Sequence, residues 1–175
     1  MANSFSISLA DQIEEGITKH AIKNGAFMYE VDGLGNFEMM DDANTPSLIS
    51  LPYLEAIPSN DETYKATRAL VLSKKNPFYY SGKWAEGIGS SHTPEGHVWP
   101  LSIAMAALTT SDKEFQLKTL SILENSDAGT GNLHESFNVN DPNKYTREWF
   151  SWSDMTYVDL VLTAHMPAKK YTKRN

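Results

Sequence analysis

The acidic residue best suited to chemistry is Glu135, which stands between His134 and Ser136 in a stretch rich in glycine and aromatic residues. A carboxylate with polar neighbours suits the activation of water, as a general base does when a glycosidic bond is hydrolysed. The alternative is a structural ion pair between Glu135 and Arg147, and spacing alone favours neither interpretation. No Gly-x-Ser-x-Gly sequence or Cys/His pair offers a competing nucleophile.

A pair of adjacent acids, Asp41 and Asp42, lies just before an apolar segment that begins at Pro46. Carboxylates at this place suit the hydroxyl groups of a sugar. The alternative is helix capping by Asp42, Asn44 and Thr45, with Pro46 at the first helical position. We expect at least one of the two aspartates to contact substrate.

Aromatic and polar residues alternate between residues 78 and 100, where Trp84 and Trp99 flank a run of polar groups. A pyranose needs such a mixture, because its apolar face stacks on a ring while its hydroxyls take hydrogen bonds. The alternative is that both tryptophans belong to the core. His92, Glu95 and His97 could form a metal cluster, but they do not have the spacing of helical metal ligands and no third histidine is nearby, so we expect no metal and no cofactor. The glycines are too irregular for a phosphate-binding loop.

The elements that must position these loops are helices of two kinds. Three amphipathic segments begin with a serine that an acid follows three residues later, the pattern of a capping box; these serines are Ser8, Ser59 and Ser111. Three other segments, 46–57, 98–108 and 148–165, are apolar on nearly every side, which is typical of buried helices. We therefore predict six helices that start near Ser8, Thr45, Ser59, His97, Ser111 and Thr146.

The capping serines recur about every 50 residues, the signature of repeated helical hairpins. An inner ring of apolar helices inside an outer ring of amphipathic ones predicts an all-α fold, an (α/α)6 toroid with its long loops on one face. Three hairpins make about half of such a ring. We expect residues 1–175 to form half of one catalytic domain, and the open flank to expose apolar surface and allow self-association.

Composition narrows the classes of partner. The chain has 175 residues, a net charge of −7 and no cysteine. Because no basic face is evident, and the basic end at 169–174 is read as a solvated tail, we expect no nucleic-acid partner. No apolar run suggests insertion into a membrane. The first eight residues do not resemble a signal peptide, so the cytoplasm is the favoured compartment.

Several sequence blocks occur in the same order as in one enzyme family. They are Asp41-Asp42-Ala43-Asn44-Thr45-Pro46-Ser47-Leu48, Gly87-Ile88-Gly89-Ser90, His92-Thr93-Pro94-Glu95-Gly96, Val98-Trp99-Pro100 and Leu133-His134-Glu135-Ser136-Phe137. Over residues 9–162 the chain resembles the C-terminal half of glycoside hydrolase family 125. The resemblance implies a metal-independent exo-α-1,6-mannosidase that inverts the anomeric carbon, acting on an α-mannoside or an oligosaccharide derived from an N-glycan.

On this resemblance Glu135 matches the general base. The family's general acid, an aspartate, belongs to the N-terminal half, for which this chain has no counterpart, so we expect the isolated chain to be inactive. Substrate binding is assigned to five residues: Asp41, Asp42, His92, Trp99 and His134. Two alternatives stay open: a sugar-binding or interaction domain that lacks the acid, and another enzyme with the same toroid architecture.

Overall fold

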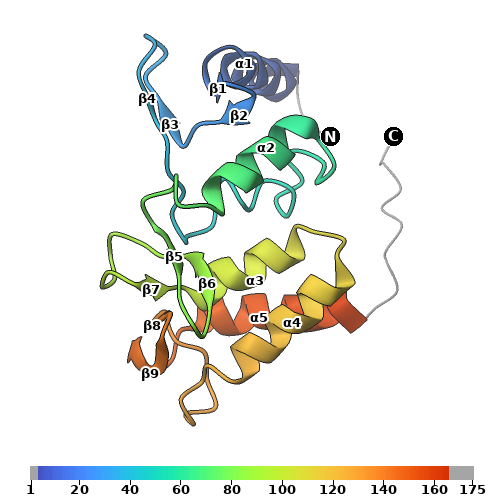
Figure 1. Cartoon of the computed structure of the whole chain (residues 1–175). Helices are drawn as coiled ribbons and strands as arrows, with labels where there is room; N and C mark the ends of the chain where they lie inside the picture. The colour runs from blue at the N-terminus through green and yellow to red at the C-terminus, as the bar shows by residue number, and fades with distance from the viewer. Residues whose placement is uncertain (1–3, 166–175) are drawn as a thin grey trace.

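The computed structural model describes residues 4–165, so the predicted tail at 169–174 lies outside the described part (Figure 1). Within it the chain is mostly helical, and the helices are α1 (Ser4–His20), α2 (Glu62–Val71), α3 (Pro100–Leu108), α4 (Lys113–Glu124) and α5 (Ser151–His165). The expectation of an all-α fold needs one correction, because short antiparallel strands occupy the loops. None of the described helices is long and apolar enough to cross a bilayer.

The strands pair as hairpins with one exception. The pairs are β1 (Ile22–Lys23) with β2 (Ala26–Phe27), β3 (Glu30–Val31) with β4 (Phe37–Glu38), and β5 (Tyr79–Ser81) with β6 (Glu86–Ile88). The exception is a three-stranded sheet in the order β7 (His97–Val98), β8 (Ser136–Asn138), β9 (Asp141–Thr146). It joins a loop before α3 to a loop before α5, so residues far apart in sequence meet here.

The helix starts differ from the predicted capping boxes. The side chain of Asp61 caps α2 by accepting hydrogen bonds from the backbone N–H groups of Thr63 and Tyr64, and Asp112 caps α4. Ser59 and Ser111 lie outside the helices, while Ser8 lies inside α1. Aspartate replaces serine as the cap because its negative charge also interacts favourably with the positive end of the helix dipole.

The predicted inner helix at 46–57 is wrong: this segment is a series of turns. Pro52 stands at its middle, has no N–H to donate and would clash with the carbonyl group of residue 48 in a continuous helix. Glu55 adopts a positive φ of 58°, which also ends any helical run. The segment is still held in place, because Ile49 is buried and its carbonyl oxygen accepts a hydrogen bond of 3.0 Å from the Tyr64 hydroxyl.

Helix α3 is the centre of the molecule. Every residue from Pro100 to Ala107 is buried, as predicted for this apolar segment, and α3 packs against both α4 and α5. Helix α5 also contains many apolar residues, but only one of its faces is buried. Its exposed large residues are Trp152, Met155, Val158 and Leu162. The expectation that α5 is buried on all sides is therefore wrong for the described chain.

Helix α1 also shows apolar residues to solvent. Leu9, Ile13 and Ile17 form the stripe that was expected to cover a core, yet all are exposed. At the other side of the molecule, Figure 1 shows β5 to β9 gathered together, next to where the chain enters α3 and α5. The long connections that carry the predicted site residues thus end on one side of the helices.

Candidate active site

Glu135 lies just before β8, on the three-stranded sheet. Only 12% of its side chain is exposed, and both carboxylate oxygens have partners: Oε2 accepts a hydrogen bond of 3.1 Å from the Thr146 hydroxyl, and Oε1 lies 3.3 Å from Nε of Arg147. The ion pair weighed as an alternative is therefore present. The pair is open to solvent on its arginine side, because 66% of the Arg147 side chain is exposed.

A series of contacts leads from Glu135 through two hydroxyl groups to an imidazole inside the protein. The Thr146 hydroxyl lies 2.7 Å from the hydroxyl of Ser136, which lies 3.2 Å from Nδ1 of His97. Ser136 and His97 are buried, and burial lowers the pKa of His97 below its ordinary value of 6.5. Sequence reasoning considered His97 only as a metal ligand. It missed this chain of contacts, because the contacts depend on how the strands pair.

Asp41 has a different environment. It is fully buried, and its two carboxylate oxygens accept hydrogen bonds from the backbone N–H groups of Leu48 (2.8 Å) and Ile49 (3.0 Å). Burial raises the pKa of Asp41 from 3.8 to about 7, while those two N–H groups act in the opposite direction. Asp41 therefore holds the turn segment 46–57 against the base of the loop that precedes it.

Asp42 joins two of the predicted loops. Its Oδ1 accepts hydrogen bonds from the backbone and side chain of Asn44, and its Oδ2 accepts one of 3.0 Å from the hydroxyl of Ser90. Close by, the Ala43 N–H donates to the carbonyl oxygen of Gly89. Gly89 cannot carry a side chain, because a Cβ would collide with the carbonyl oxygen of His97. The two loops thus meet as one tightly packed unit.

The other predicted site residues are spread between the surface and the core. His92 is exposed beside Ser90, and its N–H donates to the Ser90 hydroxyl. Trp99 is buried, donates from Nε1 to Thr93 and meets Phe150 edge to face at 5.6 Å. His134 is fully buried and stacks on Tyr145 at 3.7 Å. Their assignment to substrate binding stays a prediction.

Two exposed tryptophans near Glu135 were not assigned from the sequence. Trp149 and Trp152 follow β9, and 66% and 56% of their surfaces are exposed. The ring of Phe150, between them in sequence, lies 5.4 Å from that of Trp152, and the Arg147 guanidinium lies 5.8 Å from the Phe150 ring. The two exposed rings offer flat apolar surface of the kind on which a sugar ring stacks.

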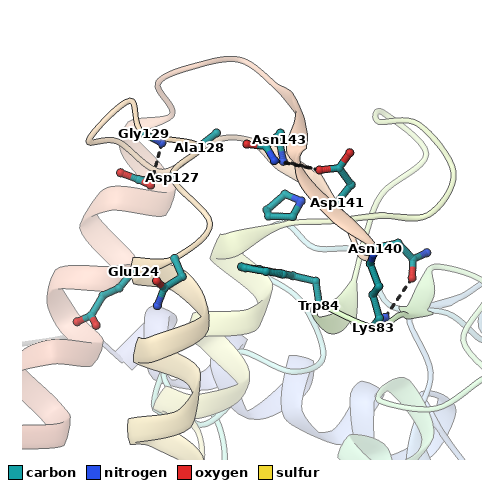
Figure 2. Close-up of a pocket in the computed structure, with 11 residues that line it drawn as sticks. Lys83, Trp84, Glu124, Asp127, Ala128, Gly129, Asn140, Asp141 and Asn143 are labelled. Carbon is teal, nitrogen blue, oxygen red and sulfur yellow. Dashed lines mark hydrogen bonds between the residues drawn. The ribbon is translucent and has the colours of Figure 1, made fainter.

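Two cavities lie near these elements. One of about 250 Å³ is lined by Thr45, Tyr53, Leu101, Met105, Trp152, Met155 and Thr156, where the 46–57 segment, α3 and α5 meet. The other, about 490 Å³, lies between the end of α4 and the β8–β9 hairpin (Figure 2). Its Asp127 and Asp141 accept hydrogen bonds from N–H groups of their own loops, and the ring of Trp84 is 41% exposed. It contains none of the predicted site residues.

Within residues 4–165 no group of three or more His, Asp or Glu side chains is arranged to hold a metal ion. The buried carboxylates that could do chemistry are instead bound by N–H groups, hydroxyl groups and one guanidinium. Such an arrangement can bind hydroxyl-rich ligands and accept a proton.

Comparison with known proteins gives consistent findings. The family model described as metal-independent alpha-mannosidase (GH125) matches residues 2–162. The Meiotically up-regulated gene 157 protein of Schizosaccharomyces pombe is 43% identical over an alignment of 159 residues, and the match covers 87% of this chain and 31% of that protein.

A solved structure is also similar. It is a metal-independent alpha mannosidase of Streptococcus pneumoniae in a non-productive substrate complex with alpha-1,6-mannobiose, and it matches with 45% sequence identity and a TM-score of 0.88. The match covers 94% of this chain and 41% of that one. The chain thus spans about a third to two fifths of the length of these proteins.

Proposed function

The chain belongs to the metal-independent α-mannosidases of glycoside hydrolase family 125, and from this premise we propose that it carries the general base, Glu135, of an exo-α-1,6-mannosidase. The observation that carries the proposal is the setting of Glu135. Its carboxylate is mostly buried and is held at both oxygens, by the Thr146 hydroxyl and by Arg147, whose guanidinium lies 5.8 Å from the Phe150 ring.

The reaction that this setting supports is hydrolysis with inversion. Glu135 takes a proton from a water molecule, whose oxygen attacks the anomeric carbon from the face opposite the leaving oxygen. An inverting enzyme needs a second carboxyl group about 6.5 to 9.5 Å away to protonate the leaving oxygen. We propose that this acid comes from a part of the catalytic domain outside residues 1–175.

The proposed substrate is a mannoside with a terminal α-1,6 linkage. The solved relative from Streptococcus pneumoniae is a complex with alpha-1,6-mannobiose, which supports this linkage. For binding, His92 offers an exposed polar side chain beside the Asp42–Ser90 hydrogen bond that joins two loops, and Trp149 and Trp152 offer rings. Asp41 acts indirectly, because both of its oxygens already bind backbone N–H groups.

We also propose that residues 1–175 form the C-terminal half of an (α/α)6 toroid. Exposed apolar residues on α1 and, from Met155 onward, on α5 support this, since both surfaces would be covered by helices of the other half. Alone, the chain should self-associate, which light scattering on the purified protein would detect. A monodisperse monomer that unfolds cooperatively would contradict the half-ring.

The activity is tested by following hydrolysis of α-1,6-mannobiose with proton NMR, using this chain joined to the rest of the catalytic domain. Inversion at an α linkage releases β-mannose first, before mutarotation equilibrates the anomers. Mannobioses with α-1,2 and α-1,3 linkages serve as controls. Early release of α-mannose would contradict the inverting mechanism, and equal cleavage of all three linkages would contradict the proposed specificity.

A second function follows if the chain acts without an acid: a module that binds mannose and releases none. This alternative is kept because the chain spans only 31% and 41% of the lengths of the two relatives. Titration calorimetry with α-1,6-mannobiose distinguishes the two, because the binding module alone should bind the disaccharide and leave it intact.

A further inference from the structure

We infer that Thr146, Ser136 and His97 form a hydrogen-bond relay that orients Glu135, and that its proton order requires His97 to carry its ring proton on Nδ1. The role of the relay in turnover rests on the proposed function of Glu135. The proton order does not, since it follows from the contacts alone. All three relay residues are positioning residues, because none of them is placed at the reacting atoms.

The relay is built by strand pairing. Ser136 of β8 lies directly opposite Thr146 of β9, and His97 of β7 lies opposite Asn138 of β8. Ser136 and Asn138 are two residues apart, so their side chains lie on the same face of the strand. The His97 ring therefore reaches Ser136 diagonally across the sheet. Strand β7 and the β8–β9 hairpin, which are far apart in sequence, thus place a row of polar side chains next to Glu135.

The proton order follows from counting hydrogens. An ionised carboxylate can only accept, so the single hydroxyl proton of Thr146 is used on Oε2 of Glu135. Thr146 must then accept from Ser136 across the 2.7 Å contact, which uses the proton of Ser136. Ser136 in turn must accept from His97, 3.2 Å away. A neutral imidazole has one N–H, and here it has to be on Nδ1.

The state of His97 agrees with this order. Burial lowers its pKa, so the ring is neutral near pH 7 and the choice of tautomer matters. The opposite tautomer, with the proton on Nε2, would make Nδ1 an acceptor and draw the Ser136 proton toward His97. The Thr146 hydroxyl would then donate its proton to Ser136 instead of Glu135, and Oε2 of Glu135 would lose its donor. The relay thus links the orientation of the Glu135 carboxylate to a histidine that lies two hydroxyl groups away.

The relay gives one oxygen of the Glu135 carboxylate a donor that is itself held in place. Thr146 fixes Oε2 through a short side chain on a paired strand, whereas Arg147 reaches Oε1 with a long and mostly exposed side chain. General-base catalysis depends on geometry at the level of a single hydrogen bond. Loss of the Thr146 hydroxyl should therefore affect turnover more than substrate binding.

The proton order is tested on this chain by nitrogen-15 NMR of the histidine rings near pH 7. We expect the Nδ1 signal of His97 to be of the protonated, pyrrole type. In Thr146→Val, which keeps the shape but removes the hydroxyl, the Ser136 proton is free to bind Nδ1, so the Nε2–H tautomer should increase. Thr146→Ser should retain the wild-type signal. An Nε2–H tautomer in the wild-type protein would overturn the relay.

Ser136→Ala is a second variant, which removes the hydroxyl that contacts His97. Thr146 can still donate to Glu135 in this protein, but His97 loses its acceptor, so the tautomer preference should disappear. If Ser136→Ala and Thr146→Val both fold, as shown by their amide spectra, and both keep the wild-type His97 signal, the contacts do not form a relay.

The effect on catalysis is measured in the protein that includes the rest of the catalytic domain. Thr146→Val should lower kcat about 10- to 100-fold, as expected for one hydrogen bond to a charged group, with KM nearly unchanged. Thr146→Ser should restore most of the activity. If Glu135→Gln abolishes turnover while Thr146→Val leaves kcat unchanged, the relay is wrong and the function of Glu135 stands. If Glu135→Gln itself is active, the proposed function fails.

Discussion

Two buried acids, Asp41 and Glu135, are held in opposite ways. The two carboxylate oxygens of Asp41 are bound by backbone N–H groups of one turn segment, so the side chain cannot move without opening the turn. Those of Glu135 are bound by the side chains of Thr146 and Arg147 at the end of a strand. A carboxylate that satisfies buried backbone groups serves the fold, whereas one that is oriented by side chains is available for chemistry.

The largest effect on stability is expected from Asp41→Ala. The change leaves the N–H groups of Leu48 and Ile49 buried without an acceptor, which costs about 1 to 3 kcal/mol each. Urea unfolding at pH 5 should thus show a loss of about 2 to 6 kcal/mol. Glu135→Ala, the matched control, should cost much less because the Arg147 guanidinium it releases is already exposed. Equal losses in the two variants would contradict the comparison.

The pH dependence of stability should also distinguish the two acids. Since the folded-state pKa of Asp41 is raised from 3.8 to about 7, the ionised form is disfavoured by folding. The contribution of this group to stability is complete below about pH 4 and is lost as the pH rises toward 7, by at most about 4 kcal/mol. Comparing wild-type protein with Asp41→Asn across this range isolates the effect. Parallel curves for the two proteins would show that Asp41 does not titrate as described.

The smallest effect on stability is expected at Arg147. Its ion pair with Glu135 is mostly exposed on the arginine side, and such pairs contribute about 0 to 1 kcal/mol. Arg147→Ala should therefore shift the free energy of unfolding by less than about 1 kcal/mol. A loss as large as that of Asp41→Ala would mean that the ion pair, like the Asp41 turn, is part of the core.

Sequence patterns predicted the helices that depend on local, continuous signals. The apolar segment at 98–108 became a buried helix, as its composition predicted. The segment at 46–57 has the same apolar character, but Pro52 outweighs it. The charged caps Asp61 and Asp112 likewise outweigh the serines that precede them.

The site was predictable only in part. The position of Glu135 and its two interpretations followed from residue types, and the structure shows that the carboxylate pairs with Arg147 and also accepts a hydrogen bond from Thr146. The contacts from Glu135 to His97 could not be found in this way. They depend on the register between strands of two to six residues, and such short strands carry no periodic signal.

The central claim, that Glu135 is the catalytic base while Asp41 supports the fold, is tested most directly by the turnover of Glu135→Gln with α-1,6-mannobiose in the protein that includes the rest of the catalytic domain. Glutamine keeps the size of the side chain but cannot accept the proton of the attacking water. Hydrolysis should fall at least about 100-fold while mannobiose binding and the free energy of unfolding remain close to those of the wild type. Near-normal hydrolysis by the folded variant would contradict the claim and make Glu135 a structural partner of Arg147.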